Sequence, residues 1–187
     1  MGFWKENDVS PKRNYRFQVY FGRVADGGEL SNSQSFWWAK TMKVPSFSIA
    51  SVEHHYLDNK YNFPGRTTWE DVQMELDPAN PDAVQIIMDM LRLSGYRVKG
   101  NPASDTGLDT IGKMKAAQVN CVMRMIDEDG NLIEQWNLNN CFILSADLGQ
   151  YDYSSDELRQ LSLTLKYDWA TCTIGGEGGT EYFPQSS

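Results

Sequence analysis

Short stretches of alternating apolar and polar residues recur along this chain. In residues 161–169, the clearest case, every second residue is Leu, Tyr or Trp, and the residues between them are polar. Alternation with a period of two places the apolar side chains on one face of a β-strand. Similar stretches, either alternating or rich in aromatic residues, are residues 15–21, 36–42, 46–57, 72–76, 119–125, 132–138 and 142–148. The pattern therefore predicts seven or eight strands.

Turn signals separate these stretches. The Asp-Gly pair at 129–130 predicts a hairpin turn, and residues 61–65 contain the Pro-Gly signature of a type II turn. A turn at residues 26–28 introduces a polar run that ends at Ser35, which predicts a loop. The chain is thus divided into short segments of the kind that antiparallel sheets use.

One stretch has the longer period of a helix. Apolar residues at 84, 87, 88 and 91 follow the spacing of one helical face. Asn80 can cap the helix, Pro81 suits its first position, and Gly95 suits its end. This is the only helix that the pattern predicts with both a start and a stop.

Many short strands and one main α-helix predict a mainly β fold, an antiparallel β-sandwich or barrel. We expect three parts in the chain. Residues 1–13 read as a polar N-terminal arm, residues 14–172 as the folded domain, and residues 173–187 as a flexible Gly-rich C-terminal tail.

Charge and cysteine content narrow the class of protein. The net charge of −8 argues against a general nucleic-acid binder that holds phosphates with Lys and Arg. Three cysteines without a CxxC spacing exclude a fully paired disulfide framework and suit a reducing compartment. The first residues are too polar for a signal peptide, and no apolar run approaches the ~18 residues of a membrane span. We expect folding in a cytoplasm and no membrane partner.

Candidate chemistry is sparse. His54 and His55 are adjacent, so on a strand they point to opposite faces and do not chelate one metal ion. The cysteines lack a neighbouring base in sequence and read as small buried hydrophobes. Residues 127–131 resemble a calcium loop, but Gly130 comes too early for that pattern, which favours a hairpin turn. We therefore expect no enzymatic activity, no cofactor and no metal site.

Two stretches of the sequence are more specific. One comprises Lys40–Pro45 and Asn59–Val72; the other runs from Gln135–Phe142 to the terminal strand Leu161–Trp169. In order and spacing they resemble the tail tube protein of contractile-tailed, T-even-like bacteriophages. The resemblance covers residues 14–170, and its most specific part is the alternating strand that ends in Tyr-Asp-Trp. The arm and the Gly-rich tail are not part of that family's compact core, which leaves room for a tube initiator or terminator relative.

The resemblance implies a structural virion protein. Its subunits form hexameric rings that stack into the inner tail tube, through which phage DNA is ejected into the host. The implied partners are further copies of the chain, the tail sheath protein, the baseplate tube initiator and the tail terminator, with tape measure protein and DNA in the lumen without specific binding. The implied location is the virion tail, after assembly in the host cytoplasm. An acidic chain suits a conduit to which DNA does not adhere.

Three candidate surfaces are expected, of which the resemblance implies the first. A hairpin between residues 45 and 66 is expected to reach the adjacent ring through Phe47, Ile49, Tyr56, Tyr61, Phe63 and Arg66; the alternative is that its apolar residues belong to the core. The polar-face residues Asp71, Gln73 and Glu75 are candidates for the lumen lining. In the tail, Tyr182 and Phe183 are expected to dock on a neighbouring subunit or on the sheath, the alternative being an unanchored tail.

Two other functions compete with the phage tube. The first is the ring-forming tube protein of a type VI secretion machine or of another contractile injection system, which shares the fold by family resemblance. The second is a small enzyme with a β-barrel pocket. The cargo that passes through a tube leaves no mark on the sequence of its subunit, so the sequence does not separate the tube functions.

Overall fold

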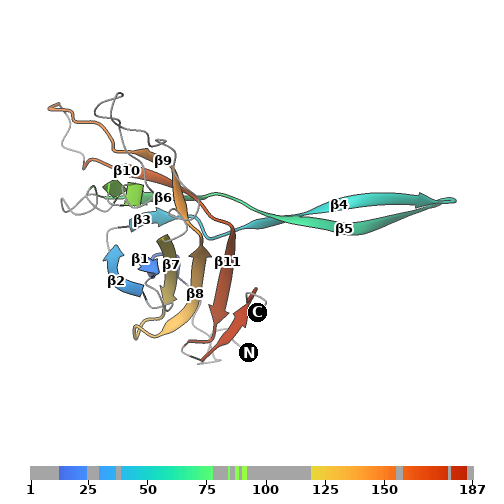
Figure 1. The fold of residues 1–187 in the computed structure, drawn as a ribbon. Coiled ribbons are helices and arrows are strands. Elements are labelled where there is room, and N and C mark those ends of the chain that lie inside the picture. Colours follow the sequence, from blue (N-terminus) through green and yellow to red (C-terminus); the bar gives the residue numbers. More distant parts are fainter. Residues whose placement is uncertain are drawn as a thin grey trace, which may run out of the picture.

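The computed structural model describes residues 13–24, 30–36, 39–77, 84, 87–88, 90–91, 119–154, 158–176 and 178–184. Within them the chain forms twelve strands (Figure 1). They are β1 (Phe17–Val24), β2 (Leu30–Phe36), β3 (Ala39–Met42), β4 (Phe47–Tyr56), β5 (Asn59–Trp69), β6 (Val72–Leu76), β7 (Val119–Ile126), β8 (Leu132–Asn139), β9 (Phe142–Asp147), β10 (Leu161–Lys166), β11 (Trp169–Ile174) and β12 (Thr180–Tyr182). All their pairings are antiparallel, which confirms the predicted fold class.

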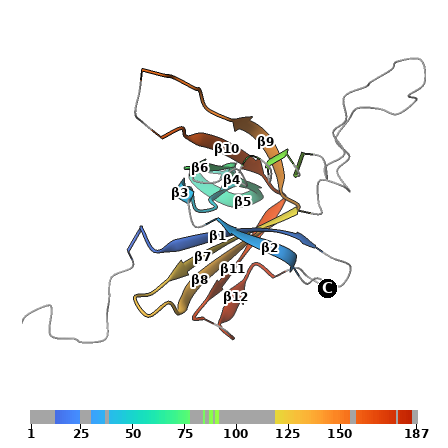
Figure 2. The same ribbon diagram turned by 90° about the vertical axis from the view of Figure 1, so that its left-hand side faces the viewer.

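The strands form two large sheets and one separate ribbon. The first sheet has six strands in the order β12-β11-β8-β7-β1-β2, and the second has four in the order β3-β6-β10-β9. Figure 2 shows these sheets as two layers of a sandwich. The remaining strands, β4 and β5, pair with each other and form a long hairpin that projects from the sandwich (Figure 1).

The hydrophobic core lies between the two layers. On β6 and β10, every second side chain is buried, as the alternating sequence predicts. Burying a Leu or Met side chain contributes about 1.5–3 kcal/mol, so this face holds the layers together. The inward residues are Val72, Met74 and Leu76 on β6, Leu161, Leu163 and Leu165 on β10, and Val19, Phe21, Cys121, Met123 and Leu138 on the six-stranded sheet.

The chain passes between the two layers at two adjoining corners. The alternating stretch 161–169 is not one strand: it breaks at Tyr167 and Asp168, so that β10 lies in the smaller sheet and β11 in the larger. Asn140, with a φ of 55°, makes the corresponding corner between β8 and β9. Asn140 Nδ2 donates a hydrogen bond to Asp168 Oδ2 over 2.9 Å, and Asp168 N donates to Asn139 O over 3.1 Å. The two corners thus hold each other in place.

Part of the predicted helix is described. Residues 84, 87, 88, 90 and 91 are helical, and Ile87 and Met90 are buried in the core cluster. The predicted cap at Asn80, the predicted stop at Gly95 and the N-terminal arm up to residue 12 lie outside the described residues. In the described part of the chain, no helix is long and apolar enough to span a membrane.

Two predictions about irregular segments were wrong. The polar run that ends at Ser35 was predicted to be a loop, yet residues 30–36 form β2, which pairs with β1. An edge strand takes its stability from pairing on one side and needs no alternating pattern. The segment from Thr173 was predicted to be a flexible tail, yet β11 continues to Ile174 and Thr180–Tyr182 pairs back onto it as β12. Gly residues at positive φ, such as Gly175 and Gly178, turn the chain between these strands.

Candidate assembly surfaces

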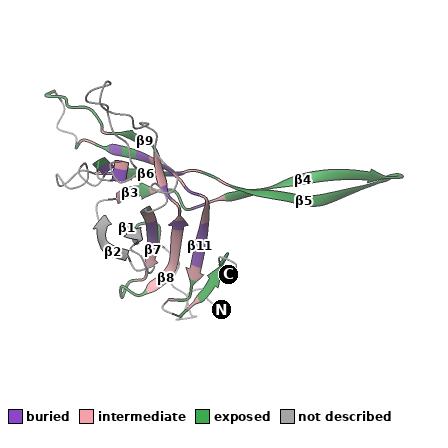
Figure 3. Cartoon of the chain, in the orientation of Figure 1, coloured by how far each residue is buried: buried purple, intermediate pink, exposed green. Residues whose placement is uncertain are grey.

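The β4–β5 hairpin is the largest exposed element of the described chain. Its strands pair from Phe47 and Trp69 at the base to Tyr56 and Asn59 next to the tip. Ten residues of β4, at about 3.3 Å each, give a reach of about 33 Å. Every residue of β4 and all of β5 except Trp69 are exposed, as the green ribbon in Figure 3 shows. The hairpin therefore offers both of its faces to a partner.

Those two faces differ in chemistry. Side chains of directly paired residues lie on the same side of a two-stranded ribbon. One side, here named the aromatic face, carries Val52, His54, Tyr56, Tyr61 and Phe63. The rings of His54 and Phe63 pack edge to face on it, with centroids 6.4 Å apart.

The opposite side of the outer hairpin, here named the polar face, carries Glu53, His55, Lys60 and Asn62. Lys60 Nζ and Glu53 Oε1 form an ion pair there at 2.6 Å. The two histidines lie on opposite sides, as predicted from their adjacency, and no described group of His, Cys, Asp and Glu is arranged to hold a metal ion. The ribbon is thus amphipathic, with one side suited to water and one to burial.

The six residues predicted to contact an adjacent ring all lie on this hairpin. Their apolar members are between 43% and 63% exposed, so the alternative that they belong to the core is wrong. They divide into two groups: Tyr56, Tyr61 and Phe63 share the aromatic face, whereas Phe47 and Ile49 lie at the base. Arg66 is exposed beside a shift in the strand register. Their role in assembly stays a prediction.

The turn of the hairpin was predicted at the wrong place. Residues 61–65 continue as β5, and the turn lies at Leu57 and Asp58. Pro64 is tolerated because a two-stranded ribbon has free edges, where a missing N–H breaks no ladder bond. Gly65 follows at a point of close approach, since a Cβ there would lie 3.0 Å from Ala50 O. Pro-Gly marks an irregularity in the ribbon here, not its end.

Sequence reasoning missed three exposed residues of this hairpin. Val52 and His54 complete the aromatic face, and their period-two spacing with Tyr56 was the available signal. Leu57, at the tip, is 85% exposed and has a φ of 49°, a conformation that disfavours branched side chains. A strained and exposed apolar residue at the most distant point of the hairpin suits a contact with another molecule.

The two residues predicted to dock on another subunit, Tyr182 and Phe183, have contacts within their own chain. Phe183 lies against the base of the hairpin, with ring centroids 5.6 Å from Phe47 and 5.7 Å from Trp69. Tyr182 ends β12 and pairs with Cys172 of β11. Docking of this segment on a neighbouring subunit or a sheath stays a prediction. In the single chain, the ring of Phe183 already packs against Phe47 and Trp69.

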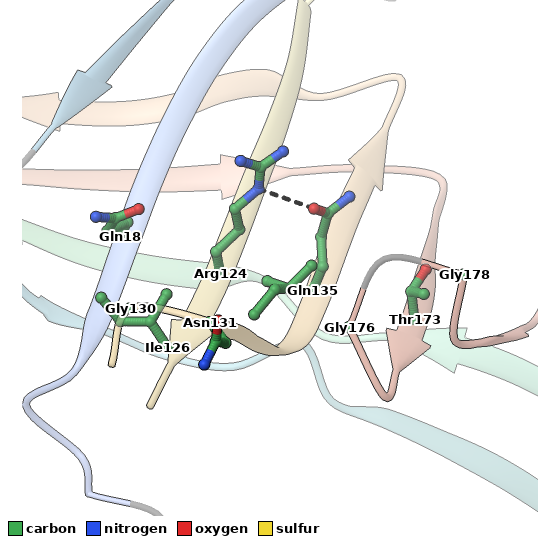
Figure 4. Close-up of a pocket in the computed structure, with 10 residues that line it drawn as sticks. Gln18, Arg124, Ile126, Gly130, Asn131, Gln135, Thr173, Gly176 and Gly178 are labelled. Atoms are coloured by element: carbon green, nitrogen blue, oxygen red, sulfur yellow. Dashed lines mark hydrogen bonds between the residues drawn. The ribbon is translucent and has the colours of Figure 1, made fainter. Parts of the chain in front are cut away.

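The outer side of the six-stranded sheet carries a ladder of polar side chains. Gln18, Arg124, Gln135 and Thr173 are cross-strand neighbours on β1, β7, β8 and β11, and a shallow hollow forms over them (Figure 4). Arg124 Nε donates to Gln135 Oε1 over 2.8 Å, and Gln135 Nε2 donates to Asn137 Oδ1 over 3.1 Å. The described residues that line the hollow include no Ser, Cys or His.

The residues predicted to line a lumen lie elsewhere. Gln73 and Glu75 point outward from β6 in the smaller sheet, and Thr41 Oγ1 donates to Glu75 Oε2 over 3.0 Å. Asp71 precedes β6 and forms an ion pair with Lys166, with 2.5 Å between Oδ1 and Nζ. This surface is therefore less negative than its carboxylates alone suggest. The molecule has two polar outer sheet faces, and sequence reasoning identified one of them.

The cysteines and the acidic turn match their predicted structural roles. All three cysteines are buried, and none of them forms a disulfide. Burial, together with the charge of Cys141, raises the pKa of the Cys121 thiol, and burial raises the pKa of Cys141 to about 12. Such thiols are not nucleophiles at neutral pH. The carboxylate of Asp127 accepts hydrogen bonds from Asn131 Nδ2 and from the backbone N–H groups of Asn131 and Asp129, which lowers its pKa and confirms a hairpin turn.

No protein-family model and no curated protein matches this chain. Solved structures share its fold. A chain of the anti-feeding prophage tube terminating cap matches with a TM-score of 0.60 and 15% identity, over 93% of this chain and 100% of that one. A chain of the sheath-tube complex of an extracellular contractile injection system, PVC, in the extended state matches with a TM-score of 0.59 and 16% identity, over 88% and 93%. A chain of the 6-fold symmetrised anti-feeding prophage baseplate matches with a TM-score of 0.58 and 16% identity, over 88% and 96%. The chain therefore has a fold that tube, cap and baseplate complexes of contractile injection systems contain.

Proposed function

We propose that this chain is a structural subunit of the tube of a contractile injection machine. In this proposal the subunits form hexameric rings, and the rings stack into the tube. The amphipathic hairpin carries the proposal, because it presents an aromatic face that nothing in the described chain covers. The fold likeness to tube and cap complexes supports it.

The hairpin requires a partner on physical grounds. An isolated two-stranded ribbon is marginally stable in water, because neither of its faces is buried. The aromatic residues of this ribbon are half exposed or more, so covering them against another molecule recovers about 25 cal/mol for each Å² removed from water. A second copy of the chain is the partner that a stacked ring supplies at every position.

The cargo is the finer part of the proposal. The sequence resemblance favours a phage tail tube that conducts DNA, with a sheath, a tape measure protein, a tube initiator and a terminator as further partners. A second candidate is the tube of a type VI secretion machine or another injection system, which the likeness to the sheath-tube complex favours. A terminator paralogue is favoured by the likeness to the cap, which extends over the whole of that chain. Purified native particles decide between them: DNA-filled heads attached to the tubes identify a phage.

Negative-stain microscopy of purified protein tests the assembly. The wild-type chain should give rings and stacked fibres at high micromolar concentration. The double substitution Tyr61→Ser, Phe63→Ser on the aromatic face should abolish fibres and leave single rings. The matched control His55→Ser, Asn62→Ser alters the polar face of the same ribbon and should stack as the wild type does.

Two results would overturn the proposal. Monomers without rings or fibres at high concentration argue against a tube subunit altogether. Normal fibres from the aromatic-face variant show that the hairpin is not the stacking contact, even where rings form. Deleting the tip from Asp58 to Asn62 provides an independent check, since it shortens the hairpin without touching its base.

A further inference from the structure

Four aromatic side chains meet where the hairpin leaves the sandwich. The ring centroids of Phe47 and Trp69, which pair across the hairpin base, are 5.3 Å apart. The ring of Tyr167 lies 5.9 Å from Trp69 and belongs to the corner between β10 and β11. Phe183, which follows β12, completes the group. Its ring packs edge to face against the rings of both Phe47 and Trp69. The cluster thus joins the separate ribbon to both layers of the sandwich.

Phe183 is held there against its backbone preference. Its φ is 60°, a value at which a bulky side chain is a rare outlier. Such a conformation is strained and persists only where the surroundings determine it strongly. On one side, the β11–β12 pairing fixes Tyr182 opposite Cys172; on the other, the ring contacts fix the side chain.

Among the described residues, Trp69, which packs against the core, and backbone hydrogen bonds at the base also attach the hairpin to the sandwich. The two chain segments at its base are linked by a hydrogen bond from Glu70 N to Ser46 O over 2.9 Å. Next to them, Lys43 N donates to Gln73 O over 2.9 Å. The hairpin is about 33 Å long, and these attachments lie only at its base. Its direction relative to the sandwich can therefore vary unless a further side-chain contact fixes it.

We propose that Phe183 is that side contact: it sets the direction in which the hairpin projects from the sandwich, and is a positioning residue for assembly. The contact acts within one chain, before any partner is present. Its consequence for stacking rests on the function proposed above. A hairpin that points correctly only part of the time binds its partner more weakly by that fraction.

Distances between two spin labels in the free subunit test the proposal. One label is placed at the hairpin tip by Asp58→Cys and the other on the sandwich by Ser145→Cys, an exposed position of β9. The native cysteines are buried, and the raised pKa values of Cys121 and Cys141 add to their protection, so they do not compete for the label. Pulsed electron resonance then gives the distribution of tip-to-sandwich distances.

We expect a narrow distribution in the wild-type background and a clearly broader one after Phe183→Ala. The control Glu181→Ala removes an exposed side chain from β12, two residues away, and should keep the narrow distribution. Phe183→Tyr retains the ring and should behave as the control does. If Phe183→Ala does not fold, as judged by circular dichroism, Phe183→Leu replaces it, since it removes the ring and keeps apolar bulk.

The same variants separate this proposal from the assembly proposal. A distribution as narrow in Phe183→Ala as in the wild type overturns the positioning role, whatever the protein assembles into. A broader distribution, combined with a wild type that forms no fibres, supports the positioning role and rejects the tube. If both proposals hold, Phe183→Ala should raise the concentration needed for fibres by roughly tenfold, as for a hairpin correctly directed one tenth of the time.

Discussion

Tyr167 has the one buried polar side-chain atom that finds no hydrogen-bond partner among the described residues. Its side chain is buried, and its ring belongs to the aromatic cluster at the hairpin base. Burial, and then the negative charges of Asp71, Cys141 and Glu70, raise the pKa of Tyr167 to about 12, so the hydroxyl stays neutral at pH 7. A neutral buried donor without a partner costs about 1–3 kcal/mol. The ring of this residue therefore stabilises the fold, and its hydroxyl does not.

Tyr167→Phe should leave the free energy of unfolding unchanged or raise it by up to about 1 kcal/mol, because it removes an unpaired group and keeps the ring. Urea denaturation measures the change. The matched control is Tyr20→Phe, since the Tyr20 hydroxyl donates to Gln18 Oε1 over 2.5 Å and its loss should lower stability by about 0.5–1.5 kcal/mol. A loss in Tyr167→Phe equal to that of the control contradicts the prediction.

At the scale of elements, the short β11–β12 hairpin positions Phe183 and thereby sets the direction of the long β4–β5 hairpin. β12 has three residues and pairs only with β11, yet Phe183 follows it directly. The turn between β11 and β12 is closed by a hydrogen bond from Gly179 N to Gly176 O over 3.0 Å. A Cβ on Gly179 would lie 2.2 Å from Ile174 O, so no other residue fits this position without moving the strand. The β11–β12 turn is therefore coupled to the distant tip of the β4–β5 hairpin.

Gly179→Ala should broaden the tip-to-sandwich distance distribution as Phe183→Ala does, although it alters no atom of the aromatic cluster. The added methyl group displaces β12 and carries Phe183 with it. Thr180→Ala, which trims an exposed neighbour on β12, serves as the control and should have no effect. Spin-label distances measured on both variants test this coupling. A narrow distribution in Gly179→Ala would show that the β11–β12 turn does not influence the direction of the β4–β5 hairpin.

The same elements show what could be predicted from the sequence. Alternation identified β6, β7, β8 and β10 because one side of each is buried against the other layer, and burial requires that period. It could not show where the chain changes layer, since Tyr167 and Trp169 continue the alternation of β10 across the corner. β2 and β12 were missed because an edge strand is held by backbone pairing, which leaves little trace in side-chain type.

The candidate surfaces were predictable to a similar extent. Aromatic residues between Phe47 and Phe63 marked the hairpin as unusual, but only the pairing register shows which of them share a side. Gln73 and Glu75 were identified as an outward polar face of β6, as the structure confirms. The polar ladder around Arg124 was not identified, because its members come from strands far apart in sequence and become neighbours only in the sheet.

At the scale of the whole molecule, the two polar outer faces pose a question of orientation. In a closed ring of sandwiches, one sheet faces the axis and the other faces outward. The face of the smaller sheet carries carboxylates with Lys166 among them, whereas the described ladder of the larger sheet carries amides, hydroxyls and Arg124. Both faces are hydrophilic, so charge alone does not show which of them lines the lumen.

Single cysteines on the two faces make the assignment. Gln73→Cys places a thiol at an exposed position of β6, and Gln135→Cys places one at a half-buried position on the outer side of β8. In assembled tubes, a bulky maleimide polymer should modify the outer face and spare the lumen face, whereas both should react in free subunits. If Asp71, Gln73 and Glu75 line the lumen, the cysteine at 73 is the protected one; its full modification in intact tubes rejects that assignment.

The register of the large sheet also has a consequence for the order of events during synthesis. β1 pairs with β7, which lies about a hundred positions later in the chain, so this pairing cannot form until β7 has been synthesised. The β4–β5 hairpin needs only local contacts, and hairpins close within about 1–10 μs. At about 5–20 residues per second, the ribosome takes roughly 3–11 s to extend the chain from Trp69 to Ile126. The aromatic residues of the ribbon are therefore exposed for seconds on a nascent chain that has no sandwich, and on a crowded polysome unintended contacts between neighbouring chains are most frequent in this interval.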